Sequence, residues 1–168
     1  MSWRRRFRYV EAASLDTFHI RFPDHVGELI VQLGRQLDGL LESDSPDLTR
    51  LFPTAYPTDP ERDAGYQVFA KDQLIEQRRN SLDVVASTIG KDLLAEDELM
   101  AWMTVVNDLR LVLGTRLDVS EDTEEFSPDD PNADAFEIYG FLGHVLSEIV
   151  DGLASVLPDE GTEAVRLD

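Results

Sequence analysis

Cysteine is absent from the 168-residue sequence. This absence excludes disulfide bonds, thiolate nucleophiles and cysteine metal sites, and it is compatible with the cytoplasmic location that we predict. Basic residues are also scarce, because 15 lysines and arginines stand against 34 acidic residues and give a formal net charge of -19. DNA affinity depends largely on cations that neutralise phosphates, so we expect no direct nucleic-acid binding. An acidic surface can instead bind a basic protein partner or metal cations, or it can serve only to keep the protein soluble.

Long hydrophobic runs and catalytic motifs are missing as well. The apolar stretches are interrupted by Asn, Asp, Arg, His or Glu, so none is expected to span a membrane. The sequence has three histidines and contains no Gly-x-Ser-x-Gly, no glycine-rich phosphate loop and no His-Glu-x-x-His. We therefore predict a protein that is not an enzyme and that needs no cofactor.

What is present is the composition of a globular protein, with 42% hydrophobic and 29% charged residues. We predict one domain over residues 1–157, followed by a frayed tail at 158–168. The expected class is mainly α, a helical bundle around a central buried helix with an N-terminal β-hairpin packed on it. The predicted elements are the hairpin at 6–22 and helices at about 24–42, 61–89, 96–117 and 132–157.

The central helix is predicted from apolar residues that step by three and four. They are Leu99, Trp102, Val106, Leu109, Leu113 and Leu117. Further apolar residues widen this face, as expected of a helix with neighbours on several sides. Asp24 and Asn132 are predicted N-caps, and Ser45 is predicted to cap a single turn. A break is expected near Lys71 and Asp72 in the second helix.

A polar group interrupts the apolar pattern and forms the main candidate site. Arg78 falls on an apolar stripe, where it must either reach solvent or meet a carboxylate. Asn107 and Arg110 are three residues apart and therefore neighbours on the central helix, whereas Asp108 points elsewhere. We interpret these residues as a network that ties the central helix to the Arg78 helix or to the hairpin. A ligand or partner site is the alternative.

Two acidic groupings were considered as metal sites. Residues 118–129 resemble a calcium loop faintly, but Thr123 and Asp129 stand where such a loop needs Gly and normally Glu. Glu137, His144 and Glu148 share a polar helix face, which would suit a metal-dependent enzyme. A solvated surface is the preferred interpretation of both groupings, and no metal is predicted.

Three segments together resemble a known family. They are RLFPTAY (50–56), WMTVVNDLRLVLGTRL (102–117) and FEIYGFL (136–142). The chain resembles the actinobacterial oxidative-stress transcriptional regulator (AosR) family, long catalogued as a domain of unknown function. Tyr56 and Tyr139 lie in these segments and are included in the predicted network. Gly140 and Phe141 depart from the family pattern, in which an acid and a tryptophan are expected.

The resemblance implies a cytoplasmic regulator that contacts an extracytoplasmic-function sigma factor, or another RNA polymerase component, and so changes stress-gene transcription. Family members also tend to be encoded near a Clp protease adaptor, which implies an accessory role in Clp proteolysis as an alternative. The described regulator senses oxidant through a cysteine pair, and this chain cannot form that switch. The broadly apolar last helix permits a homodimer without requiring one.

Overall fold

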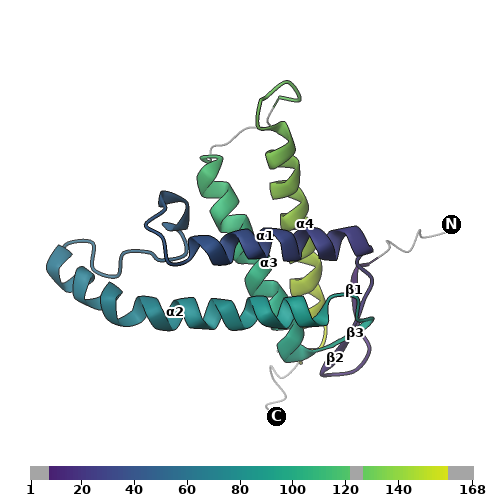
Figure 1. Cartoon of the computed structure of the whole chain (residues 1–168). Helices are drawn as coiled ribbons and strands as arrows, with labels where there is room; N and C mark the ends of the chain where they lie inside the picture. The colour runs from purple at the N-terminus through teal and green to yellow at the C-terminus, as the bar shows by residue number, and fades with distance from the viewer. Residues whose placement is uncertain (1–7, 122–126, 159–168) are drawn as a thin grey trace, which may run out of the picture.

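The computed structural model describes residues 8–121 and 127–158. Within them the chain is mainly α, with a small antiparallel sheet near the N-terminus (Figure 1), as the sequence predicted. The elements in chain order are β1 (Val10–Ala12), β2 (Thr17–Ile20), α1 (Asp24–Leu40), the 3-10 turn η1 (Pro46–Leu48), α2 (Pro60–Thr88), β3 (Leu93–Ala95), α3 (Glu96–Arg116) and α4 (Ala133–Ala154).

The predicted hairpin is present, and the sheet contains a third strand that the sequence did not reveal. β2 lies between β1 and β3 and pairs antiparallel with both. Phe18 of β2 faces Leu94 of β3, and both side chains are buried. β3 is only three residues long, so it offers too few positions for an alternating pattern. The predicted hairpin residues 6 and 7 lie outside the described chain.

The first helix begins at Asp24, as predicted, but a different residue occupies its N-cap. Pro23 occupies the N-cap position of α1, and its carbonyl accepts a hydrogen bond from the Val26 N–H at 2.8 Å. The assignment of Asp24 as the cap was therefore wrong, because Asp24 is already the first helical residue. Ser45 does cap the short turn η1, as predicted, by accepting a hydrogen bond from the Asp47 N–H.

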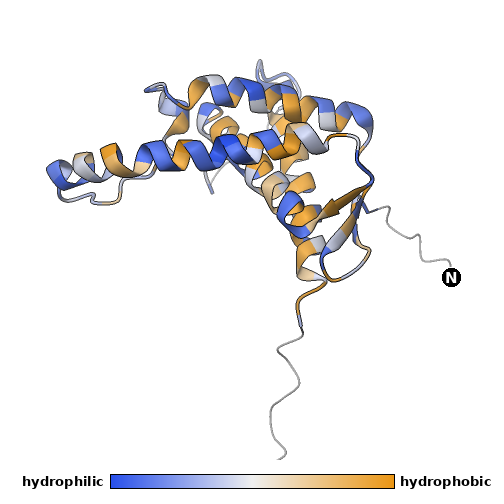
Figure 2. Cartoon of the chain, turned by 60° about the horizontal axis from the view of Figure 1, so that its bottom comes forward, coloured by the Kyte–Doolittle hydropathy of each residue, from blue (hydrophilic) through white to orange (hydrophobic). Residues whose placement is uncertain are grey.

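Helix α2 is continuous over 29 residues, so the predicted break near Lys71 and Asp72 was wrong. Asp59 caps its start by accepting a hydrogen bond from the Arg62 N–H at 3.0 Å. The sequence around the expected break consists mainly of good helix formers, which favour continuation of a helix whose C-terminal part is packed on the core. The N-terminal half projects beyond the other helices and mixes hydrophobic with hydrophilic residues (Figures 1 and 2). Gly90, which follows the C-cap residue Ile89, has a φ of 79°, a left-handed conformation that glycine adopts readily.

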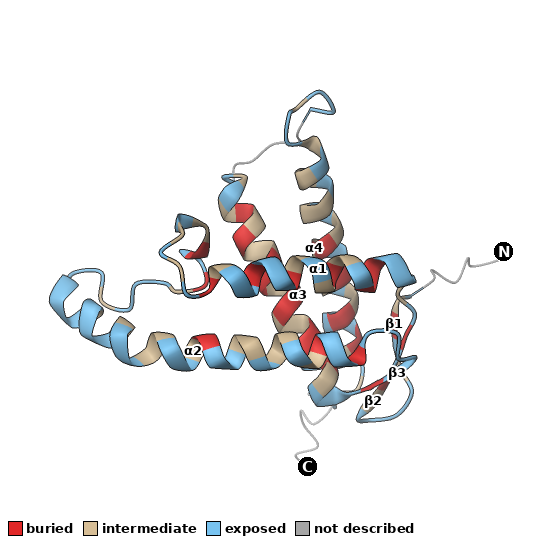
Figure 3. Cartoon of the chain, in the orientation of Figure 1, coloured by how far each residue is buried: buried red, intermediate tan, exposed pale blue. Residues whose placement is uncertain are grey.

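Helix α3 is the centre of the fold, as its spacing predicted. Nine of its 21 residues are buried, and it packs against α2 on one side and α4 on another (Figure 3). The side chains of Leu99 and Val106 are completely inaccessible to solvent. Full burial of a side chain of this size contributes about 1.5–3 kcal/mol to the free energy of unfolding.

Helix α4 begins after Asn132, at the predicted cap position, although the Asn132 side chain makes no capping hydrogen bond. The helix ends at Ala154, short of the expected residue 157. Gly152 lies close enough to β1 that an added Cβ would come within 2.5 Å of Cγ1 of Val10. The tail predicted at 158–168 lies outside the described residues apart from Pro158. No helix in the described part of the chain is long and apolar enough to cross a membrane.

Candidate functional site

Arg78 and Asp108 form an ion pair between α2 and α3. Nε of Arg78 lies 3.1 Å from Oδ2 of Asp108, and the two side chains are only 16% and 7% exposed. Nη2 of Arg78 also donates a hydrogen bond to the carbonyl oxygen of Leu51 at 3.2 Å, and the guanidinium lies 5.1 Å from the centre of the Phe52 ring. Arg78 thus joins the loop after η1 to the two packed helices.

Burial raises the pKa of Asp108 from its usual 3.8 to about 6. The charge of Arg78 and its interaction with the carboxylate act in the opposite direction and limit this rise. Loss of hydration therefore outweighs the attraction of the arginine, as is expected where an ion pair is nearly enclosed by apolar groups.

Arg110 points away from this pair and contacts α4. Its guanidinium carbon lies 4.7 Å from the centre of the Tyr139 ring, within the range of a cation–π interaction. Its Nε atom is buried and has no hydrogen-bond partner among the residues that the structure describes. Gly143 allows this approach, because an added Cβ there would lie 3.2 Å from Nε of Arg110.

The polar residues of the predicted network therefore separate into distinct groups. Asp108 meets Arg78 on the α2 side, whereas Arg110 meets Tyr139 on the α4 side. Tyr56 belongs to neither group. It lies at the projecting end of α2, where its ring packs edge-on against Tyr66 and below the guanidinium of Arg62.

Tyr56 therefore packs against the start of α2 and not over the core. Phe52 does pack against the core, but the later part of the loop is held by α2 alone. Asn107 is half-buried on α3, next to the residues that face α2. Whether any of these residues serves as a binding site stays a prediction.

The residues considered for a metal site are used differently in the structure. His144 is exposed and packs edge-on against the Tyr9 ring, while Oε2 of Glu148 accepts a hydrogen bond from the Tyr9 N–H at 3.0 Å. In the described part of the chain, no three acidic or histidine side chains gather in a way that would hold a metal ion. Residues 122–126 of the calcium-like segment lie outside the described residues.

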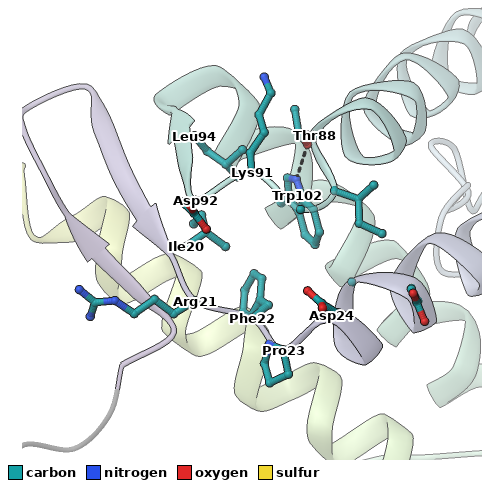
Figure 4. Close-up of a pocket in the computed structure, with 14 residues that line it drawn as sticks. Ile20, Arg21, Phe22, Pro23, Asp24, Thr88, Lys91, Asp92, Leu94 and Trp102 are labelled. Carbon is teal, nitrogen blue, oxygen red and sulfur yellow. Dashed lines mark hydrogen bonds between the residues drawn. The ribbon is translucent and has the colours of Figure 1, made fainter.

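A pocket of about 510 Å³ lies between the end of β2, the first turns of α1 and the connection from α2 to β3 (Figure 4). Its floor is aromatic. The rings of Phe22 and Trp102 stack with their centres 5.7 Å apart, and Nε1 of Trp102 donates a hydrogen bond to Oγ1 of Thr88 at 2.8 Å. Gly27 permits the close approach of α1, since an added Cβ would lie 3.2 Å from Cγ1 of Ile89.

The rim of this pocket carries charges of both signs. Lys91 and Arg21 lie at its edge together with Asp24, Glu28 and Asp92. The two cations already have partners, because Lys91 pairs with Glu98 and Arg21 pairs with Glu11, each at 2.9 Å. An apolar floor with a polar rim suits the insertion of an aromatic or aliphatic group.

No pattern in the sequence indicates this pocket directly. Phe22 was interpreted as the end of a strand and Trp102 as core. Their stacking depends on how α1 and α3 are brought together, which no local pattern specifies.

The chain is similar in sequence to several named mycobacterial proteins. The chain is 27% identical to proteins named oxidative stress regulator AosR from Mycobacterium tuberculosis and Mycobacterium bovis, over 82% of this chain and 83% of theirs. It is 27% identical to a putative oxidative stress regulator AosR of Mycobacterium leprae, over 68% of this chain and 61% of that protein. No solved structure matches the chain. The model of the family described as Domain of unknown function (DUF2017) matches residues 4–153, and the chain belongs to this family.

Proposed function

We propose that this chain is a regulatory protein that acts by binding a protein of the transcription machinery, an extracytoplasmic-function sigma factor, and not by catalysing a reaction. One observation carries the proposal. The chain is 27% identical, over 82% of its length, to mycobacterial proteins named oxidative stress regulator AosR.

The charge of the chain supports a protein partner with a basic surface. A net charge of -19 repels the phosphates of DNA but attracts cationic protein surfaces. Complementary charge speeds the encounter of two proteins and favours the correct partner. The interaction is therefore expected to weaken as salt screens it.

The pocket between β2, α1 and β3 is the contact site that we propose. Interfaces are commonly dominated by a few apolar or aromatic anchors that enter a well-formed pocket. The stacked rings of Phe22 and Trp102 offer such an anchor an apolar floor. Ile89 borders the same pocket and is 37% exposed, so the partner has direct access to it.

The test is a binding titration of the full chain against purified sigma factors of this class, at low and moderate salt. We expect Ile89→Arg, which puts a long charged side chain at the pocket, to weaken binding at least tenfold. Val150→Arg is the matched control, because Val150 is also a partly exposed aliphatic residue, at 45%, but lies on α4 away from the pocket. We expect this control to bind like the unmodified chain.

Absence of binding to every sigma factor tested, in titration and in co-purification, would overturn the proposal. Recovery of Clp components in the same co-purification would favour the accessory role in proteolysis. Because the chain has no cysteine, treating this chain alone with a thiol oxidant should leave its affinity unchanged.

A further inference from the structure

We propose that the projecting half of α2 is a dimerisation arm that pairs antiparallel with the same segment of a second copy of this chain. The segment runs over residues 60–79 and is called the arm below. Dimerisation through the arm does not depend on whether the chain binds a sigma factor.

The outer part of the arm, residues 60–74, has little contact with the core, whereas Arg78 and Arg79 at its inner end pair with carboxylates outside the arm. The first buried residue of α2 is Ile75, so the preceding fifteen residues of the helix contribute nothing to the core (Figure 3). One side of the arm is held by the preceding loop. Oδ1 of Asp63 accepts hydrogen bonds from the N–H groups of Ala55 and Tyr56, and the Gln67 amide donates to the Pro53 carbonyl. A helix of this length is marginal in water unless one face is packed.

The opposite side of the arm carries large apolar residues that face solvent. Phe69 is 85% exposed and Val68 is 80% exposed, which makes them the most exposed large hydrophobic side chains of the described chain. Tyr66 does not belong to this side, because its ring packs against Tyr56 of the preceding loop. Nothing lies within 4 Å of the place where a Cβ on Gly65 would stand, one turn before Phe69. An exposed cluster of this kind, on an otherwise unsupported helix, is expected to be covered by another protein surface.

The charge of the arm identifies a second copy as the occupant. Residues 60–79 contain four acidic and four basic residues, so the arm is formally neutral, with Arg78 and Arg79 paired to carboxylates outside it. The whole net charge of -19 therefore lies on the rest of the chain. Two strongly acidic copies repel each other, and this repulsion is smallest where neutral projecting arms meet with the acidic bodies held apart.

The order of the charges also fits an antiparallel pair. Arg62, Phe69 and Glu76 are spaced by seven residues, which is about two helical turns, and so they follow one line along the helix surface. A twofold axis through the Phe69 contact places Arg62 opposite Glu76 of the partner subunit, and it does so twice. Arg62 stacks over the Tyr56 ring and is solvent-exposed, so its guanidinium is accessible for this contact.

The test measures the mass of the full chain by sedimentation across a wide concentration range. One helix face per subunit is a small interface, so we expect a dimer that forms with increasing concentration. Phe69→Asp is expected to weaken dimerisation at least tenfold. Leu15→Asp is the matched control, because Leu15 is similarly exposed, at 78%, and lies in the hairpin turn. Far-UV circular dichroism checks that each variant keeps its helices.

Charge reversal tests the antiparallel register. Arg62→Glu and Glu76→Arg should each weaken the dimer, because each places like charges opposite each other. The double variant, and an equimolar mixture of the two single variants, should dimerise again, because opposite charges then face each other at both ends.

A chain that stays monomeric at all concentrations would overturn the proposal, as would a dimer that Phe69→Asp leaves intact. Failure of the charge swap to restore the dimer would overturn the antiparallel pairing. Loss of sigma-factor binding in Phe69→Asp without any change of mass would assign the surface to a different partner and would also overturn it.

Discussion

Nε of Arg78 lies 3.1 Å from Oδ2 of Asp108, and this ion pair joins α2 to the central helix α3. The same arginine donates a hydrogen bond to the carbonyl oxygen of Leu51. Three segments that are far apart in the sequence therefore meet at one side chain. Because the pair is nearly enclosed, removal of one partner leaves a charge that is neither hydrated nor balanced.

Loss of Arg78 is expected to cost much more than loss of its neighbour. Arg78→Met leaves Asp108 buried without a counter-ion and should lower the free energy of unfolding by about 3 kcal/mol at neutral pH. Arg79 bridges Asp38 and Glu42 on the surface, so Arg79→Met should cost less than about 1 kcal/mol. Urea denaturation of both variants checks this. Equal decreases in the free energy of unfolding would show that the enclosed Arg78–Asp108 pair contributes no more to stability than the surface pairs of Arg79.

The raised pKa of Asp108 predicts a pH dependence of stability. The unfolded carboxyl ionises near its usual pKa of 3.8, whereas the folded one ionises near 6. Between these values the folded state binds more protons, so the stability that Asp108 contributes at low pH is lost as the pH rises through 6. The difference in unfolding free energy between the unmodified chain and Asp108→Asn should therefore fall by about 2 kcal/mol from pH 4 to pH 7.

The comparison with Asp108→Asn cancels the titration of all other carboxyl groups. Urea denaturation at a series of pH values provides the measurement. Two stability curves that stay parallel would show that the folded carboxyl keeps its ordinary pKa. A stability difference between the two proteins that grows with pH would show that Arg78 lowers the pKa of Asp108 by more than burial raises it.

Helical periodicity predicted the elements whose signal is local. The heavily buried face of α3 follows from the spacing of its apolar residues, and its bounds agree with the prediction within one residue. The sequence also indicated that Arg78, between Leu74 and Leu82, must either reach solvent or meet a carboxylate, and in the structure it meets Asp108. Strand β3 was missed because its pairing with β2 depends on residues that lie far away in the chain.

Contacts between elements account for the parts of the site that the sequence did not reveal. Asp108 and Arg110 are two residues apart, so on a helix they point to different neighbours, but the pattern does not say which neighbours. The Phe22–Trp102 stack likewise depends on the approach of α1 to α3. The prediction of a break in α2 was wrong because it treated the loss of the apolar pattern as the end of the helix. A helix can continue through turns that make no contact with the core.

Arg110 and Tyr139 should show a measurable energetic coupling. If Arg110 belonged to a buried ion pair, Arg110→Ala would lower the free energy of unfolding by about 3–5 kcal/mol. Because its guanidinium instead lies over a ring, we expect a loss of about 1–2 kcal/mol. A double-mutant cycle of Arg110→Ala and Tyr139→Leu should give a coupling of about 1 kcal/mol. Additive losses would contradict the contact, and lost partner binding at unchanged stability would make Arg110 a binding residue.

Two glycines of α4 should respond in opposite ways to the same substitution. A Cβ on Gly152 would lie 2.5 Å from Cγ1 of Val10, so Gly152→Ala must displace β1 or α4 and should cost about 1–3 kcal/mol. Gly140 has nothing within 4 Å of its Cβ position, so Gly140→Ala should stabilise the chain by up to about 1 kcal/mol through higher helix propensity. Thermal and urea unfolding of the two variants measure these changes in stability. A stabilising Gly152→Ala would show that β1 packs against α4 less closely than the structure indicates, since the helix propensity gained is the same at both positions.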